Sequence, residues 1–91
     1  MTALKKHREV SYEQLLEMDH EDARKVLRKR GRLDTRHAAL YLGIPKRTFE
    51  QFRTGGRGPV WLNIEGRIYY AVEALDIYEK RAETHPEEAS A

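Results

Sequence analysis

The chain has 91 residues, which is enough for one domain with a small core. It contains no cysteine, and this excludes disulfides, zinc fingers and thiol catalysis. No apolar run is long enough for a signal peptide or a membrane span, so we expect a cytoplasmic protein that makes no membrane contact.

The net charge of +2 is distributed unevenly along the chain. Residues 1–33 carry nine Lys/Arg against six Asp/Glu, and residues 34–70 carry six against three, so each part has a charge of +3. Residues 71–91 carry two against six, a charge of −4. We therefore expect a polyanion to bind the basic part of the chain and the acidic end to face elsewhere.

Two short helices are predicted near the N-terminus. The Ser11–Gln14 stretch has the form of a capping box and precedes apolar residues at helical spacing. Asp19 can cap a second helix, which Gly31 ends. Residues 1–10 show no periodicity, so we expect them to be frayed. Residues 1–32 are thus predicted to be a helical N-terminal extension.

Six of the nine residues at 24–32, the end of this extension, are basic. They can simply form a solvated helix face that complements the helix dipole. They can also contact DNA phosphates or a neighbouring protomer, although backbone contacts carry little base information. The six residues are Arg24, Lys25, Arg28, Lys29, Arg30 and Arg32.

A helix-turn-helix is predicted between residues 33 and 53. Asp34 can cap its first helix, and Gly43 can take the left-handed conformation that ends it. In the second helix Phe49 and Phe52 are three residues apart, so they fall on one face and are expected to point inward.

The polar residues of the second helix then face outward. Arg and Gln can make bidentate contacts to base edges and Lys can contact phosphate, although an ordinary solvated face is the alternative. With residues from neighbouring segments, the predicted DNA-binding set is Arg36, Lys46, Arg47, Thr48, Glu50, Gln51, Arg53, Arg57, Arg67 and Tyr69.

Two short strands are predicted next, at Val60–Ile64 and Ile68–Tyr70. A loop of three residues, Glu65–Arg67, would put the apolar side chains of both strands on one face and point Trp61 and Tyr69 to the other. The residues of the shared apolar face would be Leu62, Ile64, Ile68 and Tyr70.

A two-stranded hairpin is not stable alone, so we expect it to pack against the helices as a wing. Arg67 would lie near the wing tip, where it could enter the minor groove or contact a phosphate, or remain a solvated loop residue. Residues 33–82 are therefore predicted to be a winged helix-turn-helix DNA-binding domain. Its last helix, Ala71–Ala82, is followed by a mobile acidic tail at 83–91.

No constellation in the sequence suggests catalysis. The four histidines are scattered without metal-ligand spacing, and the glycines at 55, 56 and 58 lack the Lys-Ser/Thr of a phosphate-binding loop. We therefore expect no enzyme activity, no metal and no cofactor.

An ordered set of residues carries a family resemblance. It comprises Leu33-Asp34-Thr35, Ala38-Ala39, Tyr41-Leu42-Gly43-Ile44, Lys46-Arg47-Thr48-Phe49, Arg53, Gly55, Gly58-Pro59, Gly66-Arg67-Ile68-Tyr69-Tyr70, Leu75 and Tyr78. Over just more than half of its length the chain resembles the excisionase-like branch of the MerR-type winged-helix family. That branch includes recombination directionality factors and AlpA-related prophage activators.

The resemblance implies a mainly α fold with a small β-hairpin. It also implies that Lys46, Arg47, Glu50 and Gln51 face the major groove, Arg53 the backbone and Arg67 the minor groove. An excisionase binds repeated DNA sites cooperatively, bends the DNA and helps an integrase to excise a mobile element.

The resemblance has departures. The family often has an acidic residue where His37 stands, Ser or Thr where Pro45 stands, and basic residues near Ala71. Leu40 stands where the family is usually polar, which suggests that the N-terminal helices pack on it or that they bridge neighbouring protomers.

Two other functions remain open at the level of sequence. An AlpA-like transcriptional regulator would use the same fold, and a protein-binding adaptor would use Trp61 and Leu40 instead of a DNA-binding face. Head-to-tail self-association on DNA is expected as well, with the acidic end of one molecule against the basic segment 24–32 of the next.

Overall fold

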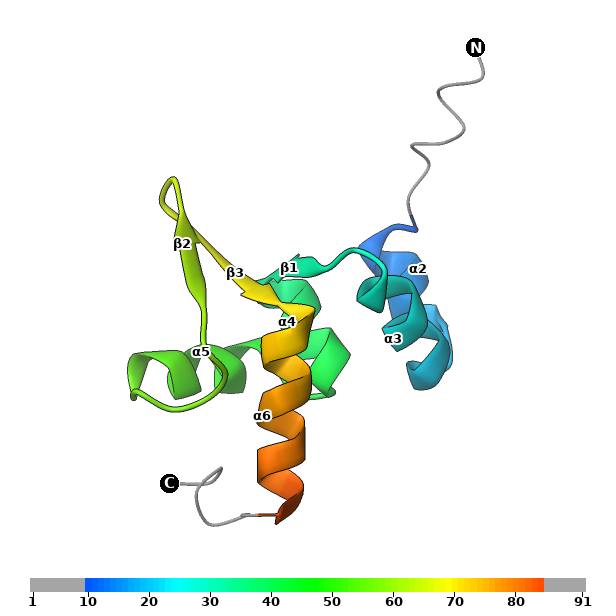
Figure 1. The fold of residues 1–91 in the computed structure, drawn as a ribbon. Coiled ribbons are helices and arrows are strands. Elements are labelled where there is room, and N and C mark those ends of the chain that lie inside the picture. Colours follow the sequence, from blue (N-terminus) through cyan, green and yellow to red (C-terminus); the bar gives the residue numbers. More distant parts are fainter. Residues whose placement is uncertain (1–9, 85–91) are drawn as a thin grey trace.

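The computed structural model describes residues 10–84, which form five helices and three strands (Figure 1). In chain order they are α2 (Tyr12–Glu17), α3 (His20–Arg28), β1 (Arg32–Asp34), α4 (Thr35–Leu42), α5 (Lys46–Thr54), β2 (Leu62–Ile64), β3 (Arg67–Ala71) and α6 (Val72–Thr84). The prediction of a mainly helical chain with a small β-structure is confirmed. Of the frayed start expected at 1–10, only Val10 is described, and its carbonyl accepts a hydrogen bond from Arg30. The mobile tail expected at 83–91 begins too early, because Glu83 and Thr84 are the last residues of α6, and the rest of it lies outside the described residues.

The predicted caps of the N-terminal helices are present. The Ser11 hydroxyl accepts a hydrogen bond from the Gln14 backbone N–H, and the Gln14 side chain accepts one from the Ser11 N–H, which completes the capping box of α2. The Asp19 carboxylate accepts from the Glu21 N–H at the start of α3. Gly31 follows that helix with φ +80°.

The helices α4 and α5 are joined by the predicted turn. The Asp34 carboxylate accepts a 2.9 Å hydrogen bond from the His37 backbone N–H and so caps α4. Gly43 ends the helix at φ +78°, and its N–H donates to the Ala39 carbonyl at 2.9 Å. Phe49 on α5 is fully buried, with its ring 4.7 Å from that of Tyr70.

The strand β1 was not predicted. It pairs antiparallel with β3, so the sheet has three strands in the order β1-β3-β2. Only three residues separate Gly31 from the first residue of α4, and a strand this short leaves no alternation to detect. Its middle residue, Leu33, is buried opposite Tyr70, so the strand ties the start of α4 to the hairpin.

The predicted hairpin register was wrong by one residue. Ile64 pairs with Arg67 and Leu62 pairs with Tyr69, so the loop holds two residues instead of three. Both loop residues have positive φ, +51° for Glu65 and +84° for Gly66, as a type I′ turn requires.

The shift turns the apolar side chains of β2 to the outer face of the sheet. Leu62 is 42% exposed there, whereas Asn63 joins Ile68 and Tyr70 on the inner face. The Asn63 side chain accepts a 3.0 Å hydrogen bond from the Gly66 N–H. This bond stabilises the two-residue turn, and it could not be anticipated from the apolar pattern.

One core unites the described residues. Leu15, Ala23 and Leu27 of the N-terminal helices are buried in the same cluster as Tyr41, Phe49 and Leu75. Leu40 packs against that cluster, and α3 contacts α4. The N-terminal helices and Leu40 thus belong to one core, which agrees with the first of the two alternatives.

A polar network around Tyr41 connects α3, α4 and α6. The buried Tyr41 hydroxyl donates to Asp76 at 2.6 Å and accepts from Arg28 at 3.0 Å. Arg24 lies over the ring at 4.2 Å, donates to the Tyr41 carbonyl, and forms a two-bond ion pair with Glu79 at 2.8 and 2.9 Å. Burial raises the pKa of the Tyr41 hydroxyl, as does the bond to Asp76, so the group remains a donor at neutral pH.

We expect Tyr41→Phe to lower the free energy of unfolding by about 1–2 kcal/mol, because Asp76 and Arg28 lose a partly buried partner. Urea denaturation measures the change. Tyr69→Phe removes a hydroxyl from the outer face of the sheet and is the matched control, expected within about 0.5 kcal/mol of the unchanged protein. Equal effects of the two changes would contradict the role assigned to the network.

Candidate nucleic-acid interface

The helical period places the outward residues of α5 in two groups, one opposite the buried side and one on a flank. Arg47 lies opposite the buried Phe49 side and is exposed, with Gln51 exposed one turn further on. Lys46, Glu50 and Arg53 form one flank. The Lys46 ammonium donates to the Glu50 carboxylate at 2.7 Å, and this hydrogen bond lowers the pKa of Glu50.

This flank of α5 forms one wall of a shallow concave surface that we call the α5 face. The other walls are the start of α4 and the hairpin, whose strands rise beside α5 (Figure 1). The lining residues are Asp34, Thr35, Arg36, Lys46, Glu50, Arg53, Arg67 and Ile68. Five of them belong to the predicted DNA-binding set, although they come from three different elements.

Neighbouring aromatic side chains hold two of these arginines in place. The Arg36 guanidinium lies 4.0 Å from the ring centroid of Tyr12, so α2 supports a residue of the α5 face. Arg53 donates a 3.3 Å hydrogen bond to the Tyr70 hydroxyl and thereby links α5 to β3. Both contacts restrict the side chains while leaving them at the concave surface.

The charge of the α5 face is positive. Its four cations face two carboxylates, and each carboxylate already has a partner: Asp34 binds His37 and Glu50 binds Lys46. Among residues 10–84, no carboxylate lies within ion-pair distance of Arg36, Arg53 or Arg67. Their charges can therefore interact with an anion that enters the concave surface.

Asp34 has a structural part in this face. Burial opposes its ionisation, but hydrogen bonds from the His37 backbone and the His37 ring at 2.8 Å outweigh that effect and lower the pKa of the carboxyl. The His37 ring in turn meets the Tyr12 ring edge-on at 5.3 Å. The carboxylate thus holds the start of α4, from which Arg36 projects.

Five members of the predicted set do not line the α5 face. Arg47 and Gln51 are exposed on the adjacent side of α5, and the other three lie elsewhere. Thr48 is half-buried on the opposite flank of α5. Arg57 lines a different groove, beside α6, with its guanidinium 5.4 Å from the Phe52 ring. Tyr69 is on the outer face of the sheet, with the Arg32 guanidinium 5.3 Å from its ring. None of these three lines the α5 face.

The basic segment 24–32 does not act as one surface. The side chain of Arg24 is only 11% exposed and binds within the protein, and Arg28 donates to Tyr41. Arg30 donates to the Val10 carbonyl at 2.9 Å. Lys25 and Lys29 are exposed on α3. The structure thus gives Arg24 and Arg28 a packing role that the run of charges did not indicate.

Sequence reasoning missed Thr35 and Ile68 at the α5 face and the support that Tyr12 gives to Arg36. Thr35 follows a predicted helix cap, so its place at the start of a helix was available as a signal. The Tyr12 contact joins positions 24 residues apart, and no local pattern could have indicated it.

No model of a known protein family matches the chain, and no curated protein matches it in sequence. Within residues 10–84, no helix is both long and apolar enough to cross a membrane.

The Asp34 carboxylate should make a pH-dependent contribution to stability. Because its folded pKa is lowered, the contribution is fully present above the ordinary value of 3.8 and is lost as the pH falls through the folded pKa. Asp34→Asn keeps a good helix cap but removes the charge. We expect the advantage of the wild type over this variant to be largest near neutral pH and to shrink below pH 3.8.

Denaturant unfolding from pH 7 to pH 2 measures this difference. Asp22→Asn, which changes an exposed carboxylate in the first turn of α3, is the matched control. A gap between wild type and Asp34→Asn that stays constant down to the lowest pH would show that the charge contributes nothing.

Proposed function

We propose that this protein binds double-stranded DNA through the α5 face as a winged helix-turn-helix protein and acts as an excisionase. The observation that carries the proposal is the convergence of Arg36, Arg53 and Arg67 on one concave surface, with no carboxylate of the described part of the chain within ion-pair distance of them. Sequence spacing alone did not require these three residues to meet.

The dimensions of an α-helix and of the DNA major groove favour this assignment. The major groove of B-DNA is about 12 Å wide and admits one α-helix. In α5 the outermost side chains are Arg47 and Gln51, residue types that make bidentate contacts to base edges. In the proposed complex the Lys46 flank faces the phosphates, and the β2–β3 hairpin acts as the wing.

Arg67 is the wing residue of this proposal. It is exposed at the first position of β3, directly after the two-residue turn, and it lines the α5 face. In this proposal its guanidinium, carried at the end of the hairpin, contacts a neighbouring groove or phosphate.

The architectural role rests on the resemblance of residues 33–81 to excisionases. A single domain with a small recognition surface has limited affinity, and neighbouring molecules on repeated sites would supplement it. In this proposal the protein bends attachment-site DNA for an integrase, works in the cytoplasm and catalyses no reaction itself. An AlpA-like regulator would bind through the same face and differ only in its target.

Mobility shifts over a salt series test the proposal. The probes are duplexes from the neighbourhood of the gene, one carrying the nearest integrase attachment site and one a promoter. We expect Arg47→Ala to weaken specific binding roughly 5- to 100-fold, because a bidentate base contact is lost. Arg67→Ala should reduce the slope of log affinity against log salt by about one, because one phosphate contact is lost.

Lys80→Ala is the matched control, because it removes a positive charge from an exposed position of α6 outside the α5 face. Cooperative shifts on the attachment-site duplex support the excisionase assignment, and a single shift on the promoter alone supports the regulator. Unchanged binding by Arg47→Ala and Arg67→Ala, or no salt-sensitive binding to any duplex, would refute DNA recognition by the α5 face.

A further inference from the structure

One cation of the α5 face is supported from outside the helix-turn-helix. Arg36 lies in the first turn of α4, and its guanidinium carbon is 4.0 Å from the ring centroid of Tyr12 on α2. The DNA-binding domain was predicted to begin at residue 33, so Tyr12 belongs to the N-terminal extension. The contact therefore brings this extension to the edge of the α5 face.

The Arg36 guanidinium meets the ring through its face and keeps its edge available. A guanidinium is planar and its N–H donors point outward in that plane, so a ring on one face uses none of them. Within residues 10–84 the Arg36 side chain makes no hydrogen bond, and no carboxylate lies within ion-pair distance of it. The stack can thus direct the side chain while leaving its donors to an anion.

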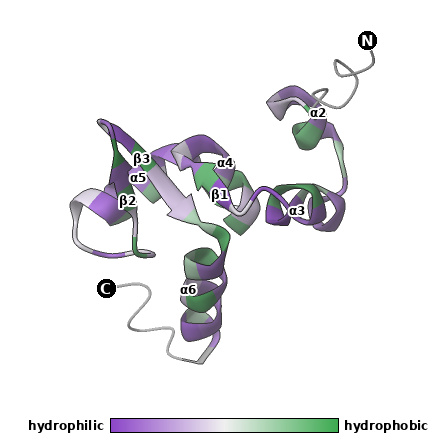
Figure 2. Ribbon diagram, turned by 45° about the horizontal axis from the view of Figure 1, so that its top comes forward, coloured by the Kyte–Doolittle hydropathy of each residue, from purple (hydrophilic) through white to green (hydrophobic). Residues whose placement is uncertain are grey.

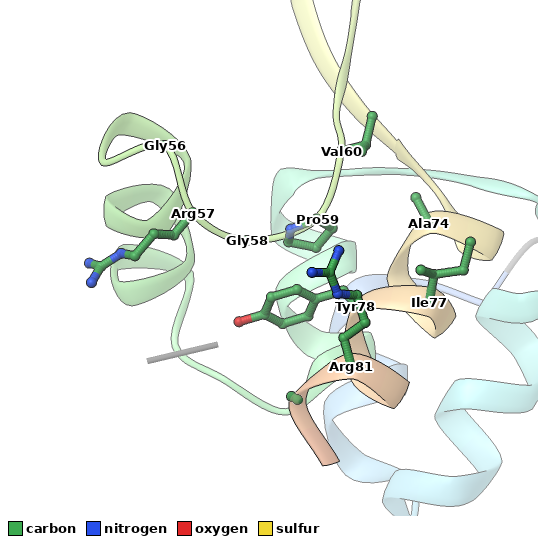
Figure 3. Close-up of a pocket in the computed structure, with 10 residues that line it drawn as sticks. Gly56, Arg57, Gly58, Pro59, Val60, Ala74, Ile77, Tyr78 and Arg81 are labelled. Carbon is green, nitrogen blue, oxygen red and sulfur yellow. The ribbon is translucent and has the colours of Figure 1, made fainter. Parts of the chain in front are cut away.

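This combination singles out Arg36 among the stacked arginines of the described residues. The others that lie over a ring are Arg24, Arg28, Arg32 and Arg57. None of these four lines the α5 face. Arg24 and Arg28 donate hydrogen bonds to Tyr41, whereas Arg57 lines the groove beside α6 (Figure 3). Arg36 alone joins an aromatic support to a place on the candidate interface.

Neighbouring residues hold the Tyr12 ring in place. The ring packs in a T-shaped arrangement with that of His37, at 5.3 Å between centroids, and His37 is itself fixed by its 2.8 Å contact with Asp34. The helix is anchored by Leu15, which is 1% exposed, and α2 carries a green, apolar segment in Figure 2. Tyr12 thus contacts two consecutive residues of α4 from a helix that is fixed in the core.

We propose that Tyr12 is a positioning residue for DNA, which orders Arg36 before the DNA arrives. This role rests on the proposed DNA binding by the α5 face. An arginine that is ordered only on binding loses side-chain freedom at that moment, and this loss lowers affinity. A backbone phosphate is the fitting anion, because it accepts two parallel N–H bonds from the edge of a guanidinium. The DNA-binding unit then extends from α2 to the hairpin.

A purely structural role of Tyr12 would give a different result. If the ring only held α2 on the core, its removal would weaken DNA binding whether or not Arg36 is present. If the ring acts through Arg36, its removal matters only while Arg36 is there. The coupling between the two changes therefore decides between these roles.

A double-mutant cycle measures this coupling. Tyr12→Leu and Arg36→Ala are made singly and together, and binding to a short mixed-sequence duplex is followed by fluorescence anisotropy over a salt series. Arg36→Ala should reduce the slope of log affinity against log salt by about one, because one phosphate contact is lost. Tyr12→Leu should weaken binding about 2- to 5-fold with the slope unchanged, and should have no further effect in the Arg36→Ala protein.

Two matched variants and one measurement without DNA serve as controls. Tyr12→Phe keeps the ring, and the Tyr12 hydroxyl makes no hydrogen bond within residues 10–84, so this variant should bind like the wild type. Leu16→Ala changes an exposed apolar residue of the same helix and should also bind like the wild type. In the free protein, the ring current should shift the Arg36 δ-methylene protons upfield, except in Tyr12→Leu. Circular dichroism verifies that each variant folds.

Equal weakening by Tyr12→Leu with and without Arg36, loss of binding in Tyr12→Phe, or an unshifted Arg36 resonance in the wild type would each overturn the proposal. A wild type that binds no duplex would overturn the proposed function and this role of Tyr12 with it. A wild type that binds DNA, combined with a cycle that shows no coupling, would overturn the role of Tyr12 alone.

Discussion

The hydrogen bonds of the buried Tyr41 hydroxyl connect three helices, α3, α4 and α6. Asp76 accepts from this group and Arg28 donates to it, while Arg24 covers the ring and pairs with Glu79. The buried hydroxyl needs these partners, because leaving it unpaired would cost about 1–3 kcal/mol. The network thereby fixes α3 and α6 against α4, the helix that begins at the α5 face.

The rest of the interface is built outward from α4. Gly43 turns the chain into α5, and Phe49 packs on Tyr70 of the central strand. Strand β1 leads directly into α4 and pairs with β3. The start of α4 is therefore tied by hydrogen bonds to the hairpin. The α5 face is consequently a concave surface assembled from three elements that share one core, and in the proposed function it places several cations against one DNA duplex.

Local signals predicted the helices well and the sheet poorly. The caps at Ser11, Asp19 and Asp34 and the turn at Gly43 depend on residues within a few positions, and all are present. The hairpin register depended on the loop length, and the Asn63 hydrogen bond to the Gly66 N–H stabilises the two-residue loop even though this loop places Glu65 at positive φ. At the candidate interface, the helical period predicted which residues of α5 point outward. The burial of Arg24 and the support of Arg36 by Tyr12 came from contacts distant in sequence.

The central claim is that the α5 face is where DNA binds. Amide chemical shifts of ¹⁵N-labelled protein, titrated at low salt with a mixed-sequence duplex, test it most directly because they report on every element at once. The account predicts the largest changes at residues 35–36, 46–54 and 64–68, with residues 74–82 of α6 little affected. Largest changes on α3 or α6, with α5 unmoved, would contradict it.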